Sequence, residues 1–112
     1  MSRSSIAKVS PLVVAIGETT SRTVRRSEFS DAIAVMVYAP ASLQGAITRS
    51  YQTSYDGITW HTLTDSGGSI TLPVVGASRH HYEMLAALFW RIAYSVAPEA
   101  DEVWRLSKQW SI

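Results

Sequence analysis

The sequence contains no cysteine and few charged residues: of 112 residues, ten are Lys or Arg and nine are Asp or Glu, together 17%. The absence of cysteine excludes disulfide bridges, cysteine-based zinc sites and thiol nucleophiles. No segment approaches the run of about 18 apolar residues that a membrane-spanning helix needs. We therefore expect a folded domain with no membrane partner. Its length suffices for one domain with one core.

Signatures of catalysis and metal binding are also missing. The histidines are His61, His80 and His81. Adjacent residues of an extended strand point to opposite faces, so His80 and His81 would not share a metal ion. There is no HExxH spacing, no GxSxG motif and no glycine-rich phosphate loop after a strand. We interpret the acidic residues within 99–102 as a solvated loop. The sequence thus predicts no enzyme, no cofactor and no metal site.

The chain is rich in hydrophobic residues, at 46%, and these fall in short runs between turn residues. Such runs of Val, Ile, Thr and aromatic residues, bounded by Gly, Pro and Asp, are typical of a β-sandwich. We predict an all-β fold, an antiparallel and jelly-roll-like β-sandwich that spans residues 11–112 as a single domain. The predicted strands are 11–16, 21–27, 32–38, 46–55, 58–64, 69–75, 88–96 and 102–110.

Two segments carry more specific expectations. The nearly all-apolar segment 32–38 suits a central strand that is covered on both faces. Between residues 82 and 96 the apolar residues recur at helical spacing, whereas Trp90, Ile92 and Tyr94 also alternate as in a strand. We expect one short helical turn over 82–88 followed by a strand. A single helix that continues to residue 95 is the alternative.

The strongest local signal is a hairpin around the dipeptide Asp56-Gly57. This dipeptide between two alternating runs favours a two-residue type I′ turn, in which both central residues have positive φ. The turn would place Thr53 opposite Trp60 and bury one face of the hairpin, which carries Ile47, Tyr51, Tyr55, Ile58 and Trp60. We assign a structural role to the hairpin residues Ser54, Asp56, Gly57, Thr59 and Trp60.

Basic residues are concentrated near the N-terminus, where residues 1–26 carry five cations against Glu18 alone. Residues 1–10 include four serines and are predicted to form a flexible or partner-bound arm. Trp110 lies two residues from the C-terminus, either tucked onto the domain or buried in a partner. We predict partner contacts at Arg3, Lys8, Arg22, Arg25, Arg26 and Trp110. The alternative is that these cations are solvated charges, which protect strand edges from aggregation. The net charge of +1 argues against direct nucleic-acid binding.

The hairpin resembles two known kinds of motif through the residues Ser54-Tyr55-Asp56-Gly57-Ile58-Thr59-Trp60. It is similar to the Asp-box, a structural β-hairpin, although Asp and Gly are adjacent here and the Asp-box has a residue between them. Similar hairpins also occur in discoidin-like and other jelly-roll sandwiches, some of which bind sugars. Both resemblances support a hairpin at this place.

A wider pattern covers about residues 27–107 and resembles small structural proteins of tailed phages and prophages. In these proteins an S-x-D-G-x-T-F/W hairpin precedes a strand with an aromatic-Ile-Arg-Leu pattern and a final R-x-L strand. The corresponding residues here are Ser54 to Trp60, Phe89-Trp90-Arg91-Ile92 and Trp104-Arg105-Leu106.

The phage resemblance implies a non-enzymatic β-sandwich accessory protein of the virion, such as a capsid cement or decoration protein. Its implied partner is the major capsid protein or another virion protein, with self-association into a homo-oligomer as a further expectation. It also implies synthesis in the host cytoplasm and location in the phage particle.

Two other classes of function stay open at the level of sequence. A carbohydrate- or receptor-binding β-sandwich module of a phage tail or fibre would use exposed aromatic side chains as sugar platforms. An enzyme of unrecognised type would need a deep pocket with converging polar groups.

Overall fold

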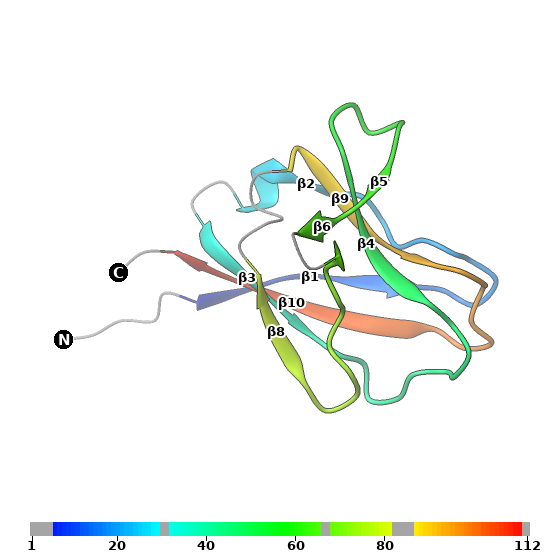
Figure 1. Ribbon diagram of the computed structural model, residues 1–112. Helices are drawn as coiled ribbons and strands as arrows, with labels where there is room; N and C mark the ends of the chain where they lie inside the picture. Colours follow the sequence, from blue (N-terminus) through cyan, green and yellow to red (C-terminus); the bar gives the residue numbers. More distant parts are fainter. Residues whose placement is uncertain (1–5, 30–31, 66–67, 82–86, 111–112) are drawn as a thin grey trace.

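The computed structural model describes residues 6–29, 32–65, 68–81 and 87–110. Two four-stranded antiparallel sheets pack against each other (Figure 1). Sheet A has the order β1 (Ile6–Val14), β10 (Glu102–Trp110), β3 (Ala32–Tyr38) and β8 (Ser78–His81). Sheet B has the order β2 (Val24–Arg25), β9 (Phe89–Tyr94), β4 (Arg49–Ser54) and β5 (His61–Thr62). A small hairpin joins β6 (Thr64–Asp65) to β7 (Gly68–Ser69), and one 3-10 turn, η1, spans Arg26–Phe29.

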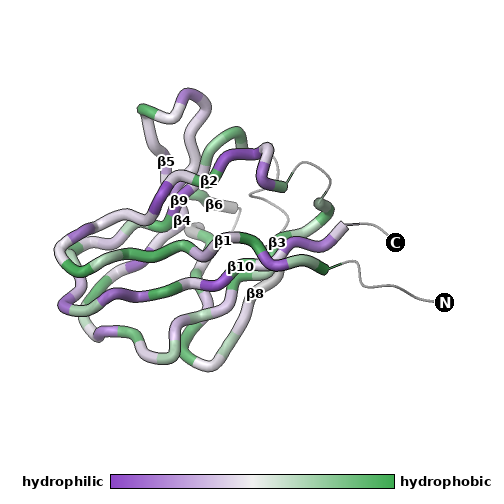
Figure 2. Tube along the Cα trace, turned by 180° about the vertical axis from the view of Figure 1, so that it is seen from behind, coloured by the Kyte–Doolittle hydropathy of each residue, from purple (hydrophilic) through white to green (hydrophobic). Residues whose placement is uncertain are grey.

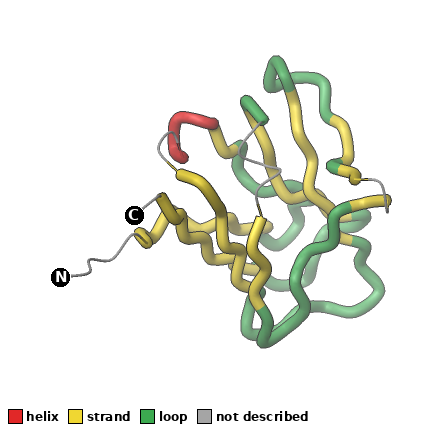
Figure 3. Tube along the Cα trace, turned by 60° about the vertical axis from the view of Figure 1, so that its left-hand side comes forward, coloured by secondary structure: helices red, strands yellow, loops and turns green. Residues whose placement is uncertain are grey.

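The strand order is that of a jelly roll. Among the eight strands of sheets A and B, the first pairs with the last and the second with the seventh; the third pairs with the sixth and the fourth with the fifth. In addition β10 lies beside β3, and β9 lies beside β4. This nested pairing is the double Greek key that defines the jelly roll. The predicted all-β, jelly-roll-like sandwich is therefore confirmed, and Figure 3 shows its strands in two layers.

The core forms where the inner faces of the two sheets meet. Alternate residues of each strand point inward, so hydrophobic and hydrophilic residues alternate along the chain trace (Figure 2). Trp104 of β10 and Trp90 of β9 are the largest fully buried side chains. The Trp90 ring makes an edge-on contact with Tyr51, at 6.1 Å between ring centroids. The buried hydrophobic cluster comprises Leu12, Val14, Val24, Phe29, Val35, Val37, Tyr51, Ile70, Leu72, Trp90, Ile92, Tyr94, Trp104 and Leu106.

Strand β1 begins at Ile6, so the predicted arm over residues 1–10 is wrong from residue 6 onward. Residues 1–5 lie outside the described part of the chain. The strand continues because it contains a bulge: Ser10 and Pro11 together oppose the single residue Arg105 of β10. Proline fits there because a bulge residue need not donate to the ladder. Arg22 donates to the carbonyl oxygens of Ser10, at 2.8 Å, and of Pro11, at 3.4 Å.

The predicted strand over 21–27 is shorter than expected, because β2 has only two residues and leads directly into η1. Glu28 in the turn accepts a hydrogen bond from the backbone N–H of Arg25 at 2.9 Å. The turn also directs Phe29 into the core, 6.3 Å from the Trp90 ring between centroids. This hydrogen bond and the burial of Phe29 end the strand at residue 25.

The region 82–96 forms a strand over its second half. Residues 82–86 of the predicted helical turn lie outside the described residues, and neither Ala87 nor Leu88 is helical. Strand β9 then pairs with β4 along its whole length, so the alternative of a helix to residue 95 is wrong. The predicted strand over 69–75 is largely an extended loop that buries Ile70 and Leu72, and β8 follows it.

The bounds predicted for the strand 32–38 are confirmed by β3, but the expectation that both faces are covered is wrong. Val35 and Val37 point into the core and are fully buried. Tyr38 points outward and keeps 39% of its surface exposed. In a two-layer sandwich even a central strand packs on the other sheet with one face only, and on the outer face of β3 Ala34 is buried, Met36 is half-buried and Tyr38 is exposed.

Leu12→Ala tests which residues of β1 point into the core after the bulge. Leu12 is completely buried, so its truncation should lower the free energy of unfolding by about 2–5 kcal/mol. Val13→Ala on the same strand is the matched control, because Val13 is 36% exposed on the outer face; it should cost about 0.5 kcal/mol or less. Urea denaturation of the three proteins measures both values. Equal losses for the two variants would contradict the assigned inward and outward faces.

Candidate functional site

The residues predicted to contact a partner do not form one patch. Lys8 lies on the outer face of sheet A, whereas Arg25 and Arg26 lie at the junction of β2 and η1, beside sheet B. Arg22 is used internally: it pairs with Glu28 at 2.9 Å and holds the bulge of β1. The remaining two predicted positions are Arg3, which lies outside the described residues, and Trp110, which is half-buried at the end of β10 opposite Ala32.

The β4–β5 loop is held by one carboxylate. The Oδ1 atom of Asp56 accepts hydrogen bonds from the backbone N–H groups of Ile58 and Thr59, both at 2.8 Å, and from the Ser54 hydroxyl at 3.0 Å. Ser54 Oγ in turn accepts a hydrogen bond from the N–H of Gly57 at 2.8 Å. The hydrogen bonds from Thr59, Ile58 and Ser54 lower the pKa of Asp56, so the carboxylate is ionised at neutral pH.

This arrangement corrects the predicted type I′ turn. Gly57 has a positive φ of 79°, but Asp56 does not have the positive φ that the turn requires. The loop is therefore wider, and the register shifts by one residue: Thr53 pairs with His61, not with Trp60. The hairpin itself exists, and Ser54, Asp56, Gly57 and Thr59 all take part in its hydrogen bonds.

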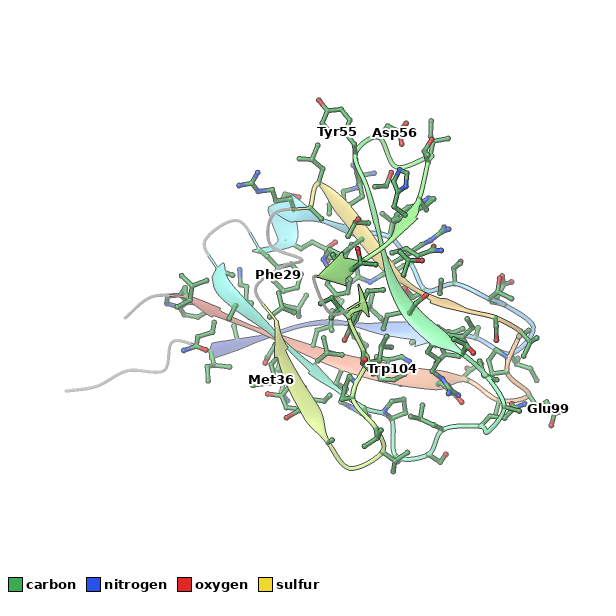
Figure 4. All side chains as sticks on the ribbon, viewed as in Figure 1. Phe29, Met36, Tyr55, Asp56, Glu99 and Trp104 are labelled. Carbon is green, nitrogen blue, oxygen red and sulfur yellow. The ribbon has the colours of Figure 1, made fainter. Side chains whose placement is uncertain are left out.

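The register shift exposes residues that were expected to be buried. Tyr55 keeps 85% of its surface exposed and Ile58 keeps 82%. Figure 4 shows Tyr55 and Asp56 at the end of the loop, which projects beyond the sandwich. We call Tyr55, Asp56 and Ile58 the loop tip. Two fully exposed large apolar side chains on a hydrogen-bonded loop are a candidate interaction element.

Trp60 is half-buried on the outer face of sheet B, outside the strand ladder. The guanidinium of Arg91 lies over its ring, 4.0 Å from the centroid, and donates to the Gln52 side chain at 2.8 Å. One face of the indole is thus covered by a cation–π contact. The prediction that Trp60 lies on the buried face of the hairpin is therefore wrong, because its ring is half-buried and stacks against Arg91 of β9.

A second apolar surface lies on the outer face of sheet A. Residues of β1, β3 and β10 line a groove of about 470 Å³ there. Its apolar part includes Ile6, Tyr38 and Pro11 of the bulge, and its two cations are Lys8 and Arg105. We call these five residues the groove. The sequence did not predict it, because residues 6–10 were expected to form an arm and the bulge interrupts the alternation of β1.

The most extensive polar site is internal and joins the two sheets. Glu102, only 4% exposed, begins β10 of sheet A. Its carboxylate accepts two hydrogen bonds from Arg49 of β4, at 2.9 and 3.0 Å, and one from the Gln44 N–H at 2.8 Å. The Tyr94 hydroxyl donates to the same carboxylate and accepts from the Trp104 indole N–H at 2.8 Å. The interpretation of 99–102 as a solvated loop is therefore wrong for Glu102.

The network perturbs two ionisable groups. Burial and the hydrogen bond to Glu102 raise the pKa of Tyr94 to about 12. Burial also tends to raise the pKa of Glu102, but hydrogen bonds from Tyr94, Gln44 and Arg49 outweigh it and lower this pKa below its ordinary value. Every oxygen of the carboxylate is occupied by partners within the protein. This arrangement fits a structural ion pair, with no oxygen left to take a proton from a substrate.

The described residues offer no metal centre: no group of three or more His, Asp and Glu among them is placed to hold an ion. Within the same ranges no helix is long and apolar enough to cross a membrane. Comparison with family models, curated proteins and solved structures finds no match to this chain. The candidate functional surfaces of the described residues are the loop tip and the groove.

Glu102→Gln tests the buried ion pair. It leaves the Arg49 guanidinium buried without a counter-charge, which should lower the free energy of unfolding by about 3 kcal/mol at pH 7. Because folding lowers the pKa of Glu102, its stabilisation is present above its ordinary pKa of 4.5 and is lost as pH falls through the folded-state pKa. The difference between wild type and variant should therefore shrink below about pH 4.

The control for this variant is Glu99→Gln, because Glu99 lies in the same turn with an exposed side chain. It should leave stability nearly unchanged. Chemical denaturation at several pH values measures all three proteins. A difference for Glu102→Gln that stays constant down to pH 2 would contradict the ionised pair.

Asp56→Ala tests whether one carboxylate organises the β4–β5 loop. Removing the acceptor of three hydrogen bonds should speed amide hydrogen exchange at Ile58 and Thr59, with exchange in β9 unchanged. Asp56→Asn keeps an oxygen acceptor at the same position and should preserve most of the protection. Exchange measured by NMR that does not differ between the two variants would show that the loop is held in another way.

Proposed function

We propose that this protein is a non-enzymatic structural protein of a tailed-phage virion, a capsid cement or decoration protein that stabilises the phage head by protein–protein contacts. The observation that carries the proposal is the distribution of polar and apolar groups. The strongest polar constellations, around Glu102 and Asp56, are occupied internally, whereas large apolar side chains stand at the surface in the loop tip and the groove. Surfaces of this kind are typical of protein interfaces.

The jelly-roll body suits this role physically. A cement protein must present fixed contact surfaces without catalytic chemistry, and a two-sheet sandwich supplies rigid edges and loops. Jelly rolls recur in capsid proteins and also in lectins, so the fold by itself does not decide between virion and sugar binding. The phage-like pattern of residues 27–107 favours the virion role.

A carbohydrate- or receptor-binding module of a tail or fibre is the second candidate, and one observation favours it. A hollow of about 280 Å³ beside the β4–β5 loop is lined by Tyr55, Thr53 and His61, among others. An aromatic ring beside polar side chains is the chemistry that binds sugars. Trp60 contributes less to this role, because Arg91 already covers one face of its ring.

Adding the protein back to particles that were assembled without it tests the first proposal. Binding to the folded particle alone should stabilise each site by about 2.7 kcal/mol at a free concentration 100 times Kd. The particles should therefore unfold at a higher temperature in calorimetry, and the protein should sediment with them. Failure to bind particles would contradict the proposed cement role. Saturable binding on a glycan array that Tyr55→Ala abolishes would select the sugar module instead.

A further inference from the structure

The loop tip and the groove lie on opposite layers of the sandwich, one projecting from it and the other hollowed into it. The loop tip extends from the end of β4 in sheet B (Figure 4). Its Tyr55 and Ile58 side chains are more than 80% exposed. The groove opens on the outer face of sheet A, which points away from sheet B. Its volume of about 470 Å³ lies within the range of sites that enclose small ligands, roughly 300–1,000 Å³. It is large enough to receive apolar side chains.

We propose that the loop tip of one copy docks into the groove of a second copy of this chain. The two elements cannot meet within one molecule, because the whole sandwich separates the outer face of sheet A from sheet B. The contact is therefore intermolecular. It rests on the part of the proposed function that treats these two surfaces as interaction surfaces.

Charge complementarity supports a second copy of this chain as the occupant of the groove. Asp56 lies between Tyr55 and Ile58 in the loop tip, and the groove carries the cations Lys8 and Arg105 beside its apolar residues. Docking would bring an exposed carboxylate toward two exposed cations while the apolar side chains enter the groove. Hydrogen bonds within the loop lower the pKa of Asp56 and keep that carboxylate charged. Opposite charges at the rim of an interface fix its orientation.

The loop is ordered before it binds. Asp56 and Ser54 fix the backbone from residue 54 to residue 59 through four hydrogen bonds. Presenting Tyr55 and Ile58 from a fixed backbone reduces the entropy lost on docking. This preorganisation explains why a loop with two exposed apolar side chains also contains a dense set of internal hydrogen bonds.

The contact is heterologous, since the loop tip and the groove are different surfaces of the chain. Each copy keeps one free groove or one free loop tip, so association continues into a ring or an open chain of copies. A contact of one loop with one groove is smaller than a stable interface, which buries about 800 Å² on each partner. We therefore expect weak self-association in solution, which is strengthened when many copies are held side by side on a particle.

Sedimentation velocity over a range of concentrations tests the proposal with two variants. Tyr55→Ser with Ile58→Ser removes the loop tip, and Lys8→Glu with Arg105→Glu reverses the charge of the groove. All four positions have exposed or largely exposed side chains, so both variants should fold. The control is Val74→Ser with Val75→Ser, which removes exposed apolar residues elsewhere, at 68% and 48% exposure.

The wild type and the control should show a sedimentation coefficient that rises with concentration, and each test variant alone should stay monomeric. An equimolar mixture of the two test variants should form dimers that grow no further. One variant supplies the intact groove and the other the intact loop tip. A monomeric wild type at about millimolar concentration would overturn the proposal. Undiminished association of either test variant, or a mixture without dimers, would do so too.

The experiments distinguish a failure of the self-docking contact from a failure of the proposed cement role. If the wild type binds particles but stays monomeric, the self-docking contact is contradicted and the cement role still stands. If the protein self-associates through these surfaces but does not bind particles, the cement role is contradicted and the self-docking contact still stands.

Discussion

The carboxylate of Glu102 joins the two sheets at one end of the sandwich. Glu102 begins β10 in sheet A, whereas Arg49 and Tyr94 belong to β4 and β9 in sheet B. A buried charge is costly unless it is paired and fully hydrogen-bonded, so Arg49, Tyr94 and Gln44 must all be in place together. The loop that carries Gln44 is thereby tied to the same end. The hydrogen bonds of Arg49 and Tyr94 to Glu102 thus link the two sheets by polar contacts in addition to apolar packing.

A second set of contacts secures the region where β2 meets η1. Arg22 bonds the carbonyl oxygens of the β1 bulge and pairs with Glu28, while Phe29 packs near Trp90. The residue that charge patterning assigned to a partner is thus an internal link between sheet A and the 3-10 turn. The bulge that it holds also contributes Pro11 to the groove. The β1 bulge therefore helps to form the groove.

Several polar groups of this protein bond to other parts of the same molecule. Asp56 orders its loop, Glu102 orders the end of the sandwich, and Arg91 covers Trp60. With 17% charged residues, part of the surface is left to apolar side chains such as Tyr55, Ile58 and Tyr38. Such apolar surface residues are the kind of groups that protein interfaces use. The proposed virion role and the self-docking contact both follow from this division.

Local patterns in the sequence were sufficient to predict the sandwich, the bounds of β3 and the strand that begins at Phe89, because short apolar or alternating runs between turn residues are visible within one segment. The Asp56-Gly57 loop was predicted only in part, since the same dipeptide fits a tight turn and a wider loop closed by the aspartate side chain. Tertiary structure alone decided the role of Glu102, whose partner Arg49 is 53 residues away in the chain. The groove is also a tertiary feature, because it needs a bulge in β1 beside β10 and β3. Side chains that meet across sheets leave no periodic signal in either segment.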